Sequence, residues 1–164
     1  MLYRNASIGS RTALSGIEER RADVERWGRL TWRLGLSLWL GSIFFLFVAI
    51  APNVFKVLPP AQAGRLVHAI FPVYDGEGLV LGALMLVGAG LLLGARRDLR
   101  RWILMAMTMI NWLLAWWSWA TLRTLQGVHE SNPRFHTLHG ESVVASVTMF
   151  LVGVGALVWD VLSI

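Results

Sequence analysis

Four runs without a charged side chain constrain the fold of this chain more than any other feature. They cover residues 34–51, 78–94, 102–122 and 142–159, and hold 18, 17, 21 and 18 residues. At a rise of about 1.5 Å per residue, each run would cross most of a hydrocarbon core about 30 Å thick as a helix. A soluble chain with four such segments would present little polar surface to water. The sequence therefore predicts an all-α, polytopic membrane protein with four transmembrane helices.

The connections between these runs are short, so we expect consecutive spans to be antiparallel neighbours in an up-down-up-down bundle. Pro52 should end the first span, and a short helix on the outer surface, at about residues 60–70, should close at Phe71-Pro72. The four spans are expected at about residues 28–51, 77–95, 100–125 and 135–162.

The segment before the first span differs in composition from the rest of the chain. Residues 1–16 are mostly small and polar and predict an irregular arm, whereas Ile17, Val24 and Trp27 recur at helical spacing among arginines and glutamates. We interpret this stretch as an interfacial helix that runs into the first span, with a solvated charged arm as the alternative. The chain then divides into a cytoplasmic part, 1–33, and a four-helix transmembrane domain, 34–164.

The basic residues predict the orientation. Seven arginines precede the first span and four lie between the second and third, whereas the other two connections hold four basic residues together. The positive-inside rule then places both termini in the cytoplasm, for a multi-pass protein of the inner (plasma) membrane. No cleavable signal peptide is expected, because the polar segment before the first span is too long and too charged. The arginines flank membrane spans, so membrane lipid rather than nucleic acid is the expected partner.

Small and polar residues inside the spans predict helix packing. Gly82, Gly88 and Gly90 should face another helix, because small residues let two backbones approach closely. Asn111 lies in the middle of the third span, where an amide usually forms a hydrogen bond to a neighbouring helix.

All four histidines map to the outer side in this topology, and so do Asp75 and Glu77. His68 and His139 are the candidate ligands of a haem, and Trp112 could stack on a haem or pigment ring. His136, His139 and Glu77 are the candidate ligands of a divalent metal. Structural hydrogen bonding is the alternative interpretation of the histidines and Glu77, and packing against a neighbouring helix or a lipid is the alternative for Trp112. The chain has no cysteine, which excludes disulfides, cysteine-ligated metal sites and a thiol nucleophile.

From the first span onward the chain contains five characteristic runs: Leu38-Trp39-Leu40-Gly41-Ser42-Ile43-Phe44-Phe45, Ala51-Pro52-Asn53-Val54-Phe55-Lys56-Val57-Leu58-Pro59, Ala63-Gly64-Arg65, Ile70-Phe71-Pro72-Val73-Tyr74 and Phe135-His136-Thr137-Leu138-His139-Gly140-Glu141-Ser142. These runs resemble the four-helix membrane family typified by transmembrane protein 205, a domain of unknown function (4149). The resemblance covers about residues 34–160 and implies four helices but no activity. The family has Tyr-Tyr or Tyr-Phe after its Phe-Pro step, whereas here Asp75 follows Tyr74.

Three classes of function fit these observations. The first is an accessory or structural subunit of a larger membrane complex, respiratory or photosynthetic for example, whose partners are other integral membrane subunits. The second is a redox protein that binds metal or haem at the outer face. The third is a transport or permeability factor, which is weakened because Asn111 is the only polar side chain expected near the midplane. Catalysis is not expected, because the sequence has no triad order, phosphate-binding loop or dinucleotide motif.

Overall fold

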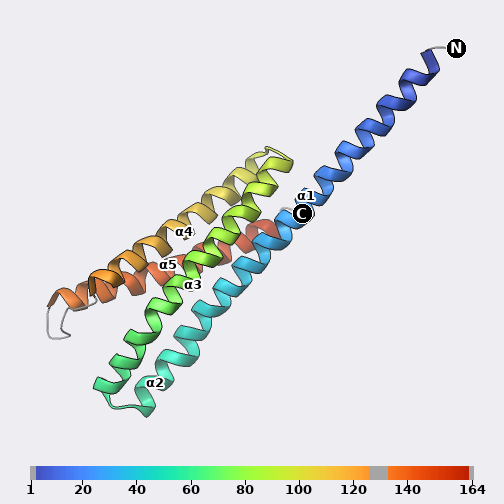
Figure 1. Cartoon of the computed structure of the whole chain (residues 1–164). Helices are drawn as coiled ribbons and strands as arrows, with labels where there is room; N and C mark the ends of the chain where they lie inside the picture. Colours follow the sequence, from blue (N-terminus) through green and yellow to red (C-terminus); the bar gives the residue numbers. More distant parts are fainter. Residues whose placement is uncertain (1–2, 126–132, 163–164) are drawn as a thin grey trace.

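The structure is a computed structural model that describes residues 3–125 and 133–162, with side chains for 15–67, 69–124 and 137–162. Nearly all of these residues are helical (Figure 1). The elements are α1 (Tyr3–Phe45), the π-helical segment η1 (Leu46–Ile50), α2 (Ala51–Val57), α3 (Pro60–Ala95), α4 (Leu99–Leu125) and α5 (Pro133–Leu162).

Four helical stretches are long and apolar enough to cross a membrane. They are Ser15–Val57, Pro60–Ala95, Leu99–Thr124 and Thr137–Leu162. Helix α1 packs against α3, α3 against α4, α4 against α5, and α5 against α1, so the four stretches close into a bundle. The predicted all-α, four-span fold is confirmed.

Helix α1 corrects one prediction about the first part of the chain. The irregular arm over residues 1–16 was wrong, because Tyr3–Phe45 forms one unbroken helix, and the proposed division at residue 33 lies inside it. Figure 1 shows α1 continuing straight past the ends of the other helices. Once packing has fixed the later turns of a helix, each further residue that becomes helical adds one hydrogen bond, and no new nucleus has to form. A weak helix propensity in residues 3–16 therefore does not end the helix. The interfacial location of this segment stays a prediction.

Two proline positions also behave differently from the prediction. The first span does not end before Pro52, because η1 leads directly into α2, where Pro52 occupies the first turn and needs no helical N–H partner. Pro72 does not close a short helix, because it lies inside α3, and the expected helix at about residues 60–70 is the first part of that element. Neighbouring helices hold the chain on both sides of Pro72, and a proline is tolerated in that setting.

The core is built around two tryptophans of α1. Trp32 and Trp39 are fully buried, together with Leu36, Met85 and Met149. The indole N–H of Trp32 donates to Thr108 Oγ1 across the bundle at 2.9 Å, so its burial leaves no unsatisfied donor. Trp39 stacks on Tyr74 of α3, with ring centroids 5.1 Å apart. These contacts tie α1 to both α3 and α4.

Candidate functional site

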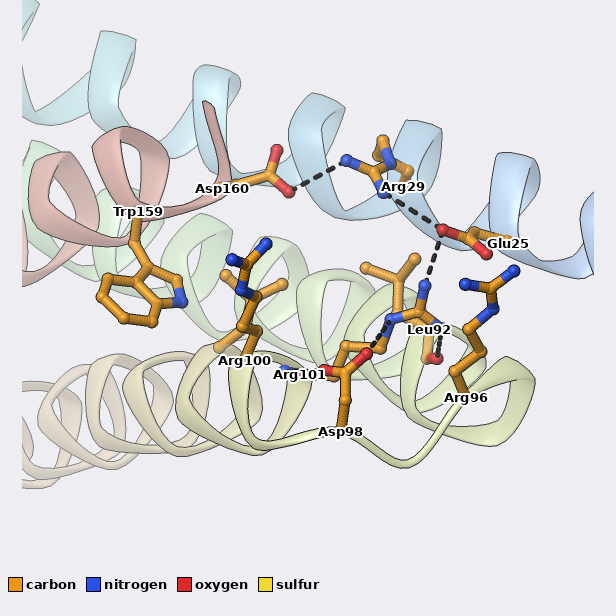
Figure 2. Close-up of a pocket in the computed structure, with 10 residues that line it drawn as sticks. Glu25, Arg29, Leu92, Arg96, Asp98, Arg100, Arg101, Trp159 and Asp160 are labelled. Atoms are coloured by element: carbon orange, nitrogen blue, oxygen red, sulfur yellow. Dashed lines mark hydrogen bonds and ion pairs between the residues drawn. The ribbon is translucent and has the colours of Figure 1, made fainter. Parts of the chain in front are cut away.

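A charged cavity of about 270 Å³ opens at one end of the bundle, where α1, α5 and the turn between α3 and α4 meet. We call it the arginine cleft (Figure 2). The described N-terminal stretch of α1 and the end of α5 lie on this side of the bundle (Figure 1). The cleft is lined by Glu25, Arg29, Leu92, Arg96, Asp98, Arg100, Arg101, Leu104, Trp159 and Asp160.

One continuous network of ion pairs crosses the cleft. Arg101 Nη2 donates to Glu25 Oε1 at 2.6 Å, and Arg29 Nη2 lies 3.2 Å from the same oxygen. Arg29 also reaches Asp160 Oδ1 at 3.4 Å, and Arg33 donates to Asp160 Oδ2 at 2.7 Å. Asp160 therefore joins the end of α5 to α1, and Glu25 joins α1 to the start of α4. We call this network the clasp; it consists of Glu25, Arg29, Arg33, Asp98, Arg101 and Asp160.

Local sequence positions each member of the clasp. Glu25, Arg29 and Arg33 are four residues apart and therefore share one face of α1. Asp98 is the N-cap of α4, because its Oδ1 accepts the backbone N–H of Arg101 at 2.9 Å. The same cap places the Arg101 guanidinium over the end of α3, where Nη1 donates to the carbonyl of Leu92 at 2.8 Å. That carbonyl belongs to the last turn of α3 and also accepts the backbone N–H of Arg96 at 3.2 Å.

A second group of polar side chains lies in the opposite half of the bundle. Asp75 of α3 is 1% exposed, and its Oδ1 accepts a hydrogen bond from Ser118 of α4 at 3.4 Å. Its Oδ2 has no hydrogen-bond partner among the described residues, and neither has the buried hydroxyl of Tyr74. An intramembrane carboxylate is costly to bury and is more often functional than an exposed one.

The predicted metal and haem ligands lie only partly within the described residues. The described residues contain no group of three histidine or acidic side chains able to hold a metal ion. Glu77 accepts a hydrogen bond from Ser42 of α1 at 2.7 Å, whereas the ring of His139 lies edge-on to Phe71 at 6.4 Å. The side chains of His68 and His136 lie outside the described residues. These histidines and Glu77 therefore remain candidates from the sequence alone.

Of the three glycines expected at helix contacts, Gly82 and Gly88 lie at close contacts and Gly90 lies at an ordinary one. A Cβ atom at Gly88 would lie 2.6 Å from the backbone nitrogen of Trp32, and one at Gly82 would lie 2.5 Å from the Trp112 ring. Trp112 thus packs against α3, and its indole N–H donates to the carbonyl of Leu79 at 3.3 Å. A Cβ atom at Gly90 would lie 3.8 Å from Cε at the flexible end of the Met105 side chain, which is an ordinary contact.

Asn111 connects three helices in the core. Its Oδ1 accepts the indole N–H of Trp39 at 3.2 Å, and its Nδ2 donates to the carbonyl of Met149 at 2.9 Å. The oxygen and the nitrogen of the side-chain amide therefore join α4 to α1 and α5, which is a structural role.

Sequence reasoning missed the clasp and the burial of Asp75. The i, i+4 spacing of Glu25, Arg29 and Arg33 was a visible signal for one charged face. Nothing in the sequence indicated that Arg101 and Asp160 would meet that face. Asp75 was assigned to the outer side because the helix was expected to stop at Pro72.

Comparisons with known proteins identify a family for this chain. The family described as a domain of unknown function, DUF4149, matches residues 34–129, which is more than half of the chain. This chain belongs to the DUF4149 family. An uncharacterized protein of Aquifex aeolicus (strain VF5) is 35% identical over 123 residues, covering 74% of this chain and 86% of the relative. No solved structure matches the chain. The DUF4149 match begins inside α1, so the first part of that helix and the clasp residues on it precede the family region.

Proposed function

We propose that this DUF4149 protein is a non-catalytic accessory subunit of a larger membrane complex and that the free part of α1 contacts the partner. In this proposal the arginine cleft faces the cytoplasm, as the positive-inside rule predicts. The observation that carries the proposal is the extension of α1 beyond the bundle (Figure 1).

The extension has no neighbouring helix in the part of the chain that the structure describes. Residues 18–25 of α1 still lie beside the end of α3, with Ala95 and Arg96 across a shallow cavity. Residues 3–17 would project about 20 Å further at the rise of a helix. An isolated helix of this length is marginal in water, so a contact outside this chain would stabilise it.

The face that α1 turns toward α3 continues through Val24, beside the end of α3, to Ile17 on the extension. Gly28 and Gly35 lie against α3. Ile17 and Val24, at the same helical face, are 51% and 38% exposed. Burying them would stabilise a contact by about 1.5–3 kcal/mol per side chain at full burial. A partner helix that continued the line of α3 would cover this row.

The clasp would make the extension a stiff connector rather than a loose arm. Glu25 and Asp160 fix α1 to α4 and α5 through charge-assisted hydrogen bonds at 2.6 and 2.7 Å. A helix held in this way would transmit a fixed direction to its partner and would lose less conformational entropy on binding.

The test is purification from the native membrane in mild detergent, followed by measurement of the native mass. The full chain should co-purify with other integral membrane proteins in fixed stoichiometry. Deleting residues 1–16 behind a new initiator methionine should leave the helical content and thermal unfolding of the bundle unchanged while reducing the fraction in the complex.

A point variant separates the contact surface from the length of the helix. Ile17→Glu should reduce co-purification, because a charge would be buried against the partner. Val57→Glu, at an exposed position 78% accessible at the other end of the bundle, is the matched control and should co-purify normally. A native mass that contains this chain alone, as one copy or several, would contradict the subunit role.

A further inference from the structure

We propose that the arginine cleft binds the phosphate of an anionic phospholipid. The proposal concerns the cleft itself and does not depend on a partner at α1. It rests on the charge balance of the cleft, on its position in the bundle and on the chemistry of its walls.

The cleft carries more positive charge than its own acids neutralise. Its three carboxylates all belong to the clasp, which also uses three arginines. Arg96 and Arg100 line the same cavity in addition, so the clasp and the cavity wall together hold five arginines and three carboxylates, a formal excess of two positive charges. Arg96 makes no ion pair with the described residues and is exposed. Guanidinium groups are well suited to phosphate, because they donate two parallel hydrogen bonds to its oxygens.

The internal pairs hold this excess in place. Arg101 donates to Glu25 and to the Leu92 carbonyl, so its side chain, 12% exposed, is committed to the fold. Figure 2 shows Arg96 and Arg100 on either side of Arg101, with their guanidinium groups directed toward the cavity. The clasp therefore supplies a rigid wall, and the two further arginines supply the charge that attracts an anion.

The position of the cleft suits a lipid headgroup. Trp159 forms one wall, and tryptophan is enriched at the level of lipid headgroups. Leu92 and Leu104 also line the cavity, on the side of the apolar spans. Basic cavities between membrane helices are known to bind anionic headgroups. A volume of about 270 Å³ is near the lower end of small-molecule sites, which fits a headgroup rather than a whole lipid.

The experiment measures lipid retention by the full-length protein. The protein is purified in detergent with equal amounts of phosphatidylglycerol and phosphatidylcholine, and lipid adducts are counted by native mass spectrometry. We expect one phosphatidylglycerol per chain, retained about tenfold or more over phosphatidylcholine. Arg96→Gln/Arg100→Gln should lose this preference. Lys56→Gln/Arg65→Gln removes the same charge at the opposite end and should keep it.

A variant that is expected to raise lipid retention distinguishes a lost binding site from a misfolded protein. Asp98→Asn removes one negative charge from the cleft but keeps an N-cap side chain for α4, so it should raise retention of phosphatidylglycerol. Circular dichroism in phosphatidylcholine verifies that each variant folds.

Three outcomes would overturn the proposal. The first is equal retention of the two lipids by the wild-type protein. The second is unchanged preference in Arg96→Gln/Arg100→Gln. The third is that inorganic phosphate, added to the protein in phosphatidylcholine, raises the unfolding temperature as much as phosphatidylglycerol does. That result would assign the cleft to a free anion rather than to a lipid.

Discussion

The acids of this bundle lie in two contrasting environments. At the arginine cleft, Glu25 and Asp160 each contact two arginines. Asp160 is itself only 5% exposed, but its partners Arg29 and Arg33 are about one-third exposed and reach the surface of the bundle. In the opposite half, Asp75 is 1% exposed and has a single hydrogen bond, at 3.4 Å, from Ser118. No cation contacts Asp75 among the described residues.

The difference shows that the same residue type has opposite energetic consequences at the two places. A carboxylate at the edge of the bundle gains from long arginine side chains that reach it while remaining hydrated. A carboxylate inside the bundle loses hydration and regains little of it from one neutral hydroxyl. The acids of the cleft therefore hold the fold together, whereas Asp75 is maintained by the packing around it.

The largest expected effect on stability comes from disturbing the close approach of α1 and α3. Gly88→Leu would place a side chain against the backbone of Trp32 and Gly28, so α1 and α3 must separate. We expect a loss of about 3 kcal/mol or more, because backbone atoms cannot move aside as a flexible side chain can. Thermal unfolding in detergent, followed by circular dichroism, measures it.

Gly90→Ala is the control for this change, because its Cβ would make only an ordinary contact with Met105. The control should change stability by less than about 0.5 kcal/mol. If Gly88→Leu unfolds at the wild-type temperature, the close approach does not hold α1 in place.

The second effect concerns Asp160. Asp160→Asn removes the charge that Arg29 and Arg33 share, and we expect it to destabilise the protein by about 1–2 kcal/mol. The value is below that of a fully buried pair because both arginines are about one-third exposed. A double-mutant cycle with Arg33→Gln should give a coupling that decreases in high salt. A coupling of zero would show that the pair is not a stabilising contact.

The smallest effect has the opposite sign. Asp75→Asn keeps the shape of the side chain and removes the possibility of a buried charge, so stability should stay equal or rise by about 1 kcal/mol. The same unfolding experiment measures it beside Asp160→Asn. Destabilisation of Asp75→Asn by as much as Asp160→Asn would mean that Asp75 has a stabilising partner and would remove the contrast between the two regions.

Much of the fold could be predicted from local sequence, and most of the cleft could not. The four charge-free runs identified the spans, and the arginine-rich turn identified a short connection between α3 and α4. The ends of the helices were less predictable, as Pro52 and Pro72 show, because a proline stops an isolated helix but is tolerated where neighbours hold the chain. That one difference moved Asp75 from an expected outer position into the core.

The sequence by itself determined that the chain is an all-helical protein with four membrane-crossing stretches, because hydropathy over about 20 residues is a local sum that needs no knowledge of neighbours. It also determined the family through motifs that begin in the first span. Only the tertiary structure decided which charges meet. Glu25 and Arg101 are 76 residues apart, and Arg29 and Asp160 are 131 apart. The first contact forms where Gly28 and Gly88 let α1 approach α3 closely, and the second where α5 packs against α1. Such a contact is a property of the packed helices. It is lost when one helix shifts along its neighbour by a fraction of a turn, and hydropathy does not encode that shift.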